Sequence, residues 1–514
     1  MNGANGNDHL VNSVLVLGGG SAGFLAAITL KHRLPHLPVT LLRSKDIAII
    51  GVGESTLPGV PKHLHQYLKL DIGDFFRRAE PLWKLGIRFL WGKRPYFDYV
   101  FGRQLDAKYP TLRKEPGYYC DEGPFDYVGM MSGLMTHNAV WLRQGNGMPV
   151  VSGDFAYHIE NKKFVAYLET VAQRLGVVVQ EDTVVEVLQK EAGVSGLRLA
   201  SGATASADLF VDSSGFASIL LGKALAEPFI SFKSNLFNDR AVVGWWPRGE
   251  EPIQPYTTAE SMGAGWCWQI DHETRIDRGY VYSSAFISDT DAEAEFRAKN
   301  PKVADTRIVK FKTGRYMRGW VKNVVAIGNA SGFVEPLEST ALAAACTQSK
   351  AIAEGLADGE GHVRPSMIKL YNKLHCGEWA MIRQFLAIHF KFNTRFETLY
   401  WQACRRDAEL EGAADIVEHY QEYGPSGVWR ATLIPPNDAW QMEGYLSLLL
   451  GQQVPYRKTY TPSAQDLLAW QQIRQRIREK VGHAFTVPEA FRLIRSPGWA
   501  WPQRLLDQPL PPSL

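Results

Sequence analysis

The stretch from Ser13 to Leu34, SVLVLGGGSAGFLAAITLKHRL, decides the fold of this 514-residue chain. A short apolar run rich in Val and Leu leads into glycines spaced as GxGxxG, and Leu, Ala and Ile follow at helical spacing. Gly18 permits a tight turn, Gly20 lets the backbone approach a pyrophosphate, and Gly23 lets the helix pack closely on the strand. Unpaired N–H groups at the helix start favour the phosphate charge. The stretch predicts a strand, a turn and a helix that bind a dinucleotide, with an ordinary glycine turn as the alternative.

The second strand, PVTLLR, ends in Arg43, where dinucleotide sites usually have an acid for the ribose hydroxyls. An arginine there could bind a ribose phosphate, as in NADP, or stack on an adenosine. Two later apolar strands also end in turns, at Asp212 and at Gly328-Asn329. This distributed arrangement is similar to the discontinuous FAD domain of flavin monooxygenases, and it favours FAD over a nicotinamide cofactor. Ordinary strand-to-helix joints of an α/β protein are the alternative.

The composition excludes several classes of function. Lys and Arg total 56 against 53 Asp and Glu, and a net charge of +3 is too balanced to indicate a nucleic-acid partner or an anionic membrane surface. The five cysteines are scattered without a CxxC pair, so neither a disulfide framework nor a metal site is predicted. The polar N-terminus resembles neither a signal peptide nor a membrane anchor. We expect a soluble protein of the cytoplasm, with lobes around one main domain.

Five motifs occur in the order GGGSAG, IIGVGEST, WKLGIRF, WCWQI and GFVEPLEST. As a set they resemble the flavin-dependent halogenases of the tryptophan-halogenase type. The resemblance implies an α/β fold with a discontinuous FAD-binding Rossmann-like domain of the flavin monooxygenase type, a substrate sheet region and a helical C-terminal lobe. The FAD-binding domain would span residues 1–360, with substrate-covering insertions at about 95–150 and 230–300. Residues 361–514 would form a mostly helical region that completes the substrate pocket.

The resemblance assigns catalysis to Lys84, within PLWKLGIRF, and to Glu338, within GFVEPLEST. Thr340 and Ala341 lie where this second motif runs into a helix, so their N–H groups are unpaired first-turn donors suited to a halide. The family usually has glycine in place of Ala341, and the added methyl group leaves the preference between chloride and bromide open. Outside this motif series, Lys84 would be a solvated lysine on a helix and Glu338 a helix-start residue.

The remaining site residues also follow from the resemblance. The loop Gly51 to Thr56 corresponds to a flavin strap, although a flexible turn is the alternative. The residues expected to bind FAD are Gly18, Gly20, Ser21, Ala22, Gly23, Arg43, Glu54, Val184, Asn329 and Leu342. The residues expected to line the substrate pocket are Phe101, Trp266 and Trp268, although aromatic residues at such spacings also suit a core. Tyr99 stands where the family often has histidine, and no metal ligand set is predicted.

The implied reaction is the chlorination or bromination of an electron-rich arene, namely indole or an indole derivative. FADH2 from a separate NADH-dependent flavin reductase, O2 and a halide would give hypohalous acid, which Lys84 and Glu338 position. A homodimer is a family expectation. The family grips free tryptophan with a Tyr-Tyr pair and an acid, and LIPPNDAWQMEGYLSLLLGQQVPY lacks that arrangement. An indole, an indole derivative, or a larger or carrier-bound aromatic compound is therefore expected.

Two other functions share the flavin domain: an FAD-dependent aromatic hydroxylase and a flavoprotein without catalytic activity. The segment GWCWQID, residues 265–271, separates the first of them from a halogenase. Two indoles at alternate positions share one face of a strand and can block the flavin from the arene. Cys267 between them is expected to be a packing residue. Asp271 replaces the family's proline, and the loss of a fixed φ predicts a differently shaped wall.

Overall fold

The structure, a computed structural model, describes residues 9–46, 53–102, 120, 126–457, 461–503 and 505–507. The chain forms two compact units, and each is assembled from three separate segments. Unit 1 comprises Met1–Pro81, Ile159–Lys233 and Phe311–Ile382, and unit 2 comprises Leu82–His158, Ser234–Lys310 and Arg383–Leu514. The division into functional domains at residue 360 stays a prediction.

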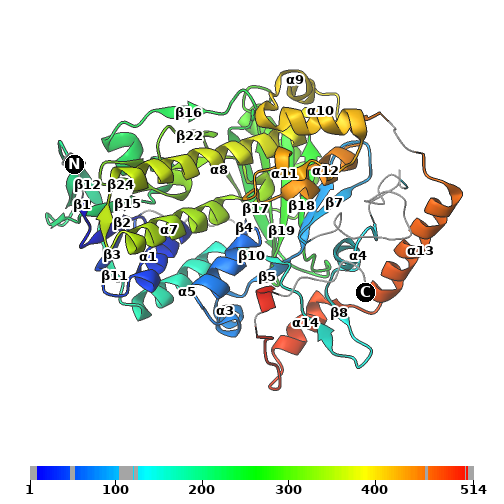
Figure 1. Ribbon diagram of the computed structural model, residues 1–514, viewed down its shortest axis with the longest axis horizontal. Coiled ribbons are helices and arrows are strands. Elements are labelled where there is room, and N and C mark those ends of the chain that lie inside the picture. The colour runs from blue at the N-terminus through cyan, green and yellow to red at the C-terminus, as the bar shows by residue number, and fades with distance from the viewer. Residues whose placement is uncertain are drawn as a thin grey trace, which may run out of the picture. The chain divides into compact units, whose positions relative to one another are not determined.

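Unit 1 is built on a six-stranded sheet with the order β11-β3-β2-β15-β24-β23 (Figure 1). Its strands are β2 (Val14–Leu17), β3 (Val39–Arg43), β11 (Val178–Glu181), β15 (Leu209–Asp212), β23 (Trp320–Val321) and β24 (Val324–Ala326). All neighbours pair in parallel except β23 and β24. The three strands that sequence analysis expected to end together, β2, β15 and β24, are direct neighbours, which confirms the α/β class.

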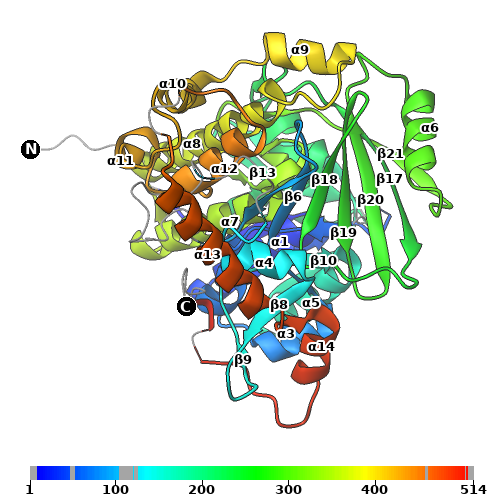
Figure 2. The ribbon, with the colours of Figure 1, turned by 90° about the vertical axis from the view of Figure 1, so that its right-hand side faces the viewer.

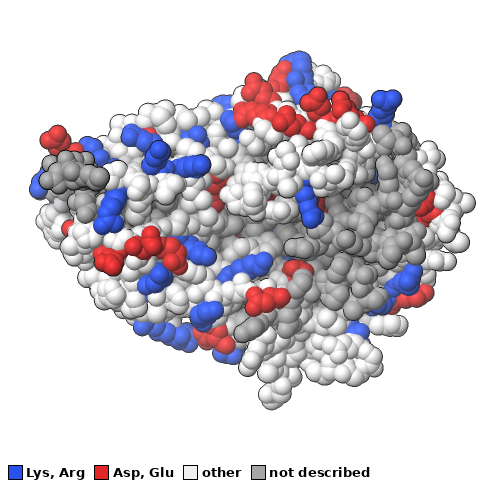
Figure 3. Space-filling model, in the orientation of Figure 1, with Lys and Arg blue, Asp and Glu red and all other residues white. Residues whose placement is uncertain are grey.

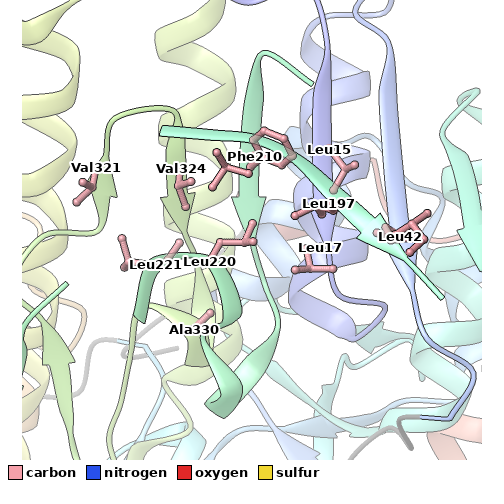
Figure 4. Packing of buried hydrophobic residues seen from close by; sticks show 13 residues of the cluster. Leu15, Leu17, Leu42, Leu197, Phe210, Leu220, Leu221, Val321, Val324 and Ala330 are labelled. Atoms are coloured by element: carbon pink, nitrogen blue, oxygen red, sulfur yellow. The ribbon is translucent and has the colours of Figure 1, made fainter. Parts of the chain in front are cut away.

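The helices α1 (Ser21–Arg33), α5 (Asn161–Arg174) and α7 (Ala341–Asp358) lie side by side in unit 1 (Figure 1). The other face of the sheet packs on a three-stranded sheet, as the close view in Figure 4 shows, through a cluster that includes Leu15, Leu197 and Phe210. That sheet consists of β12 (Val184–Lys190), β13 (Gly193–Leu199) and β14 (Thr204–Ala205). Burial on both faces explains the continuous apolar runs of the parallel strands.

Short elements complete unit 1 around this core. They are β1 (His9–Leu10), β4 (Gly53–Ser55), α2 (Gly59–Pro61), the π-helix η1 (Lys62–Tyr67), α3 (Ile72–Ala79), η3 (Gly215–Ala217), the π-helix η4 (Ile219–Ala224), β16 (Phe229–Ser231), β22 (Gly314–Tyr316), η5 (Gly328–Ala330), β25 (Gly332–Phe333), η6 (Pro336–Glu338) and β26 (His362–Val363). Two elements contribute residues to both units, namely β10 (Ala156–Glu160) and α8 (Pro365–Lys391).

Unit 2 contains a seven-stranded sheet with the order β21-β17-β20-β19-β18-β6-β7 (Figure 2). Its strands are β6 (Gly86–Leu90), β7 (Phe97–Val100), β17 (Arg240–Pro247), β18 (Thr257–Met262), β19 (Gly265–Asp271), β20 (Arg275–Tyr282) and β21 (Thr306–Lys310). Only β18 and β6 pair in parallel. Helix α6 (Asp289–Lys299) covers one face, where Cys267, Tyr280, Tyr282 and Phe296 form a core. Cys267 is therefore a packing residue, as the sequence predicted.

The rest of unit 2 is mainly helical after residue 383, as expected. It comprises β5 (Leu82–Lys84), α4 (Met130–Thr136), β8 (Ala139–Arg143), β9 (Pro149–Val150), α9 (Leu399–Asp407), η7 (Glu411–Ala413), α10 (Ala414–Tyr423), α11 (Arg430–Leu433), α12 (Gln441–Gly451), α13 (Ala464–Val481), β27 (Phe485–Thr486), α14 (Val487–Ile494) and η8 (Leu505–Asp507). Among the described residues, no helix is both long and apolar enough to cross a membrane. Figure 3 shows basic and acidic side chains mixed over one face, with acidic ones gathered over α9 and α10.

Candidate functional site

The turn between β2 and α1 is tightly packed at two glycines and open at a third. A Cβ on Gly18, whose φ is +126°, would lie 2.4 Å from the carbonyl oxygen of Ser213. A Cβ on Gly23 would lie 2.0 Å from the carbonyl oxygen of Gly18. Around Gly20, by contrast, no other described atom lies within 4 Å of the place a Cβ would take. The open position is the one at which a pyrophosphate was expected to approach the backbone.

The first turn of α1 presents backbone donors beside this opening. Gly20 is the N-cap, and the helix gives the N–H groups of Ser21, Ala22 and Gly23 no acceptor. The hydroxyl of Ser21 donates to Oδ1 of Asn161 at 2.8 Å, so it anchors α5. The backbone here suits an anionic group, and a dinucleotide phosphate fits both the charge and the space.

Arg43, at the end of β3, is held by two carboxylates. Its guanidinium donates to both oxygens of Glu169, at 2.9 and 2.7 Å, and to Oε1 of Glu181 at 2.8 Å. Burial lowers the pKa of Arg43, but these two partners outweigh it and raise the pKa overall. Glu181 lies opposite Arg43 in the parallel β11, so the acid expected at the end of β3 stands on the neighbouring strand. Two carboxylates disfavour a ribose phosphate here, which argues against NADP.

Other expected cofactor residues lie at the same edge of the sheet. Asn329 is the middle residue of η5, directly after β24. Val184 begins β12 and packs against the core cluster of Figure 4. Asp212 ends β15 and accepts hydrogen bonds from the N–H groups of Leu220 and Leu221, at 2.8 and 2.9 Å, so its carboxylate caps η4.

The expected flavin strap is described only in part. Gly51 and Val52 lie outside the described residues, whereas Gly53, Glu54 and Ser55 form β4. The surrounding protein desolvates Glu54 and raises the pKa of its carboxyl to about 7. At neutral pH a good part of Glu54 is therefore protonated, which lets this carboxyl donate a hydrogen bond as well as accept one.

Glu338, Thr340 and Ala341 form a turn at the start of α7. Glu338 ends η6 with its side chain fully buried, and Ser339 then adopts a left-handed conformation with φ of 60°. Thr340 is the N-cap without a side-chain capping bond, and the helix begins at Ala341. The N–H groups of Ala341 and Leu342 are first-turn donors at the positive end of the helix dipole. The residues expected to bind a halide thus lie at a helix start, next to a buried carboxyl group, and halide binding there stays a prediction.

Lys84 ends β5, and its side chain is fully buried. The preceding Trp83 points to the other face of the strand, where it packs on Trp141 and Phe491. Nζ of Lys84 lies 5.1 Å from the ring centroid of Phe101. A solvated lysine on a helix, the alternative considered from sequence, is wrong: the ammonium group lies in a buried strand beside an aromatic ring.

His158, which sequence analysis did not single out, is a neighbour of Lys84 on the adjacent β10. Ala156 pairs with Lys84 and His158 with Leu82, so His158 and Lys84 are diagonal neighbours on one face. The Nδ1–H group of His158 donates to the carbonyl oxygen of Asp271 at 3.1 Å, which leaves Nε2 to accept from Oγ1 of Thr257 at 2.9 Å. Burial and, next, the charge of Lys84 hold the pKa of His158 well below its usual value, so the ring is neutral.

Trp266 and Trp268 share the face of β19 opposite to Cys267. Their ring centroids are 6.0 Å apart, and both side chains are buried. A Cβ on Gly279 in the paired β20 would lie 2.0 Å from Cζ2 of Trp268, so only glycine leaves room for this indole. The two tryptophans therefore form a continuous aromatic surface on the strand, as the alternating pattern predicted.

Asp271, at the end of β19, is buried in a polar network. Its carboxylate pairs with Nη2 of Arg248 at 2.9 Å and accepts from the N–H group of Gln254 and from Nε2 of Gln269, both at 2.9 Å. Its carbonyl oxygen holds His158. Where the family has a proline, this chain thus has a side chain that ties the end of β19 to the connection between β17 and β18.

A run of aromatic contacts continues from Phe101 through unit 2. Ring centroids are 6.1 Å apart for Phe101 and Tyr99, 6.3 Å for Tyr99 and Phe385, and 4.2 Å for the stacked Phe385 and Trp440. Phe385 also meets Tyr445 edge-on at 4.9 Å. These rings come from segments that are far apart in the sequence. Among those segments, only the one that contains Tyr99 and Phe101 carries a motif that could predict its aromatic residues to belong to the site.

Asp438 lies two residues before Trp440 of this aromatic run, and its carboxylate is hydrogen-bonded within the protein. Its Oδ2 accepts from the hydroxyl of Tyr445 at 3.0 Å, and its Oδ1 accepts from the N–H groups of Trp440 and Gln441 at 2.8 and 3.0 Å. Burial raises the pKa of Asp438. Asp438 and Tyr445 thus hold one another, and both oxygens of the carboxylate accept hydrogen bonds from within the protein.

The sequence model of the family described as tryptophan halogenase matches residues 13–467. The chain is 32% identical over 445 residues to the tryptophan 7-halogenase KtzQ of Kutzneria sp. (strain 744), covering 81% of this chain and 82% of KtzQ. It is 30% identical to the tryptophan 7-halogenase RebH of Lentzea aerocolonigenes, over 80% and 82% of the two chains. The structure of MibH, a lanthipeptide tryptophan 5-halogenase, is similar with a TM-score of 0.87 and 34% identity, over 97% of this chain and 95% of MibH.

Proposed function

Because the chain belongs to the tryptophan halogenase family and is a flavin-dependent halogenase, we propose that it chlorinates or brominates an indole ring. The observation that carries this proposal is the place of Lys84, whose ammonium group is buried in a strand and faces the ring of Phe101. A buried cation with an aromatic wall suits a small, neutral, polarisable electrophile such as hypohalous acid better than it suits a charged substrate.

The cofactor is FAD, bound in its reduced form and supplied by a separate NADH-dependent flavin reductase. The space at Gly20 and the first-turn donors of α1 fit its pyrophosphate, and Arg43, held by two carboxylates, would contribute to the binding of its adenosine half. The other residues that we propose to bind FAD are Glu54, Val184, Asn329 and Leu342. Reduced FAD would supply two electrons and O2 would be the oxidant, so that one oxygen atom reaches the halide as hypohalous acid and the other leaves as water.

The halide binds at the start of α7, where the N-cap Thr340 and the first-turn residues Ala341 and Leu342 carry N–H groups that can donate to an anion. Ala341 carries a methyl group that the family's glycine lacks, and this methyl group reduces the space for the halide. We propose that the site accepts both chloride and bromide and that the methyl group sets their ratio.

Lys84 donates a hydrogen bond to the hypohalous acid and increases the electrophilic character of its halogen. The neutral ring of His158 adds no second positive charge beside it, and its two nitrogens are committed to Asp271 and Thr257. Glu338, buried in the halide turn, accepts the proton that the arene loses when the carbon–halogen bond has formed. Trp266 and Trp268 keep the arene from the flavin, so oxygen is not transferred to carbon.

The proposed substrate class follows from Asp438, because the carboxylate of this residue is already hydrogen-bonded within the protein. Asp438 is bound to Tyr445 and to backbone N–H groups, so it does not bind the α-ammonium group of free tryptophan. Indole, or an indole derivative without that group, fits better. A tryptophan side chain within a peptide is the second candidate, since its backbone nitrogen carries no charge and since MibH, to which this chain is similar, is a lanthipeptide tryptophan halogenase.

The test is a mass-spectrometric screen of the purified protein with FAD, a flavin reductase, NADH, O2 and either bromide or chloride. The panel contains indole, 3-methylindole, free tryptophan and a short peptide with one central tryptophan. We expect halogenated indoles or peptide, which the bromine isotope pattern identifies, and at most traces of halotryptophan. Hydroxylated or unchanged compounds across the panel would favour an aromatic hydroxylase or a flavoprotein without activity and would refute the proposal.

A further inference from the structure

A polar pair lies between α7 and α8 in unit 1. Gln348 of α7 is fully buried, and its Nε2 donates to Oε2 of Glu378 on α8 at 3.1 Å. Neither residue belongs to the motifs of the family, and the reaction proposed above does not use them. A buried amide beside a carboxyl group lowers the stability of the fold if any of its hydrogen bonds is missing, because a buried polar atom is then left unsatisfied. We therefore expect such a pair to hold a neighbouring part of the chain in place.

The amide of Gln348 holds the turn η5. Its Oε1 accepts from the N–H group of Gly328 at 2.8 Å, and its Nε2 also lies 3.4 Å from Oγ of Ser331. The hydroxyl of Ser331 in turn donates to the carbonyl oxygen of Gly328 at 2.9 Å. Both ends of η5 are therefore bound to one side chain, and Asn329, the proposed flavin contact, lies between them.

The same turn packs on the dinucleotide helix. A Cβ on Gly328 would lie 3.2 Å from Cβ of Ala22 in α1 and 3.9 Å from Cβ of Ala345 in α7. A small change in η5 would thus move backbone at the first turn of α1 as well. The pair of Gln348 and Glu378 therefore adjoins the expected flavin site at two places. Gly328, which Gln348 binds, precedes Asn329 in the chain and packs against Ala22 of α1.

Glu378 decides which way the amide of Gln348 points. With Oε1 toward Gly328, the amide accepts from an N–H group, and its NH2 group needs an acceptor on the other side, which Glu378 supplies. The flipped amide would place two donors face to face at Gly328. An ionised carboxylate only accepts, whereas a protonated one can also donate and so tolerates either orientation.

We propose that Glu378 is a positioning residue for the flavin, which acts through Gln348 on the turn Gly328–Ala330. This inference rests on the proposed flavin site. Desolvation raises the pKa of Glu378 to about 8, and hydrogen bonds from Gln348 and Thr347 partly oppose this shift. The charge of Glu378 also acts on Cys346 of α7 and Tyr371 of α8, and it raises the pKa of both, after burial. The amide is therefore fixed most firmly above pH 8, where Glu378 is ionised.

The experiment measures the dissociation constant and the absorbance spectrum of FAD bound to the full-length protein between pH 6.5 and pH 9. The variants are E378Q, E378L and Q348L. The control is E479L, which removes another glutamate that accepts from a glutamine, Gln475, at 2.9 Å on exposed α13. We expect E378L and Q348L to weaken FAD binding about tenfold, because each leaves a buried donor or acceptor unmet. E378Q should stay within about twofold at pH 6.5 and E479L at every pH.

The pH series separates positioning from a purely structural role. The ratio of dissociation constants, E378Q over wild type, should rise severalfold from pH 6.5 to pH 9, since only the wild type gains a carboxylate. An unchanged ratio, or FAD spectra of E378L and Q348L identical to the wild type, would overturn the inference while leaving the proposed function intact. If the wild type itself does not bind FAD, the proposed function fails first.

A second measurement does not depend on FAD. The unfolded chain releases the proton of Glu378 near the ordinary glutamate pKa, whereas the folded chain keeps it until about pH 8. Between these values the folded state binds more protons, so the free energy of unfolding of the wild type falls as the pH rises. E378Q lacks this slope and should become the more stable protein toward pH 8. If both proteins lose stability in parallel, Glu378 is not the group that titrates.

Discussion

At the scale of single residues, motifs in the sequence predict which side chains take part in the reaction, and the structure shows how those side chains are embedded. Lys84 and Glu338 were expected from their motifs, and the structure buries both fully. His158 could not be predicted, because it meets Lys84 through the pairing of β10 with β5 and no local pattern marks it. Asp271 replaces the family's proline, but two of the partners of its carboxylate, Arg248 and Gln254, lie in the connection between β17 and β18 and could not be predicted. Chain-local patterns thus identify reactive residue types, whereas the groups that tune them come from distant segments.

Replacement of Lys84 by methionine tests the role of its ammonium group. The side chain stays unbranched, becomes one atom shorter and loses its charge, so we expect halogenation to fall by a factor of about 100 or more while FAD binding is unchanged. The pKa of His158 should rise when the charge of Lys84 is removed, although burial keeps it below its usual value. Product analysis and NMR titration of His158 measure the two effects.

The control for this variant is Lys163→Met on α5, which removes a half-buried lysine paired with Glu80 at 2.7 Å. It should halogenate like the wild type. Normal product formation by the Lys84→Met protein would exclude Lys84 from the mechanism.

Asp271 makes a prediction about stability. Its carboxylate is fully buried and pairs with Arg248, whose side chain is 6% exposed. Asp271→Asn leaves a buried guanidinium without its counter-charge, and we expect the free energy of unfolding to fall by about 3 kcal/mol. Urea denaturation followed by tryptophan fluorescence measures this change. The double variant Asp271→Asn and Arg248→Met removes both charges and keeps an acceptor oxygen for the N–H group of Gln254, so it should recover part of the loss, and a double variant as unstable as Asp271→Asn would show that the ion pair is not the cause.

At the scale of elements, sequence predicted the strands and helices well where one segment carries its own pattern. The strand, turn and helix from Ser13 to Leu34 are observed as β2 and α1, and the tryptophan strand is observed as β19. Pairing between strands was not predictable. Glu181 supplies the acid missing after β3 because β11 lies beside it in the sheet, and Gly279 gives Trp268 its space because β20 pairs with β19. These contacts depend on which strands pair with one another, and the pairing of strands cannot be read from a single sequence.

The pair of β19 and β20 gives a prediction of its own. In Gly279→Ala the new methyl group would lie 2.0 Å from Cζ2 of Trp268, so the indole must turn away from its place. We expect the tryptophan fluorescence spectrum to shift, halogenation to fall about tenfold or more, and the consumption of NADH to lead to hydrogen peroxide in place of product. Assays of product and peroxide at equal enzyme concentration measure the coupling.

Gly263→Ala is the matched control, because the nearest atoms that a Cβ at this position in the same sheet region would meet belong to the flexible side chain of Glu295, at 3.1 Å. That variant should keep its coupling. A Gly279→Ala protein with unchanged fluorescence and coupling would show that the position of Trp268 does not matter for the reaction.

At the scale of the whole molecule, each compact unit is assembled from segments that alternate along the chain. The family resemblance predicts an FAD domain in residues 1–360, and this boundary stays a prediction; the compact unit 1 continues to Ile382. The reason is the first part of α8. Asn372 accepts from the N–H groups of Gly319 and Trp320, both at 2.8 Å, and the hydroxyl of Tyr371 donates to the carbonyl oxygen of Ala326 at 3.1 Å. The apolar stripe of this helix was visible in the sequence, but the unit it belongs to was not.

Two truncated chains test whether α8 is needed for the cofactor. Residues 1–360 contain every residue proposed to bind FAD, but they lack the contacts of Asn372 and Tyr371 and the carboxyl group of Glu378. Residues 1–391 include the whole of α8 and otherwise lack the same C-terminal region. We expect the shorter chain to show less helix by circular dichroism and no measurable FAD binding, and the longer chain to retain some binding, because the edge strand β23 and the turn η5 then keep their partners. Equal FAD binding by both chains would show that α8 does not support the cofactor site, and it would make residue 360 a true boundary of the FAD domain.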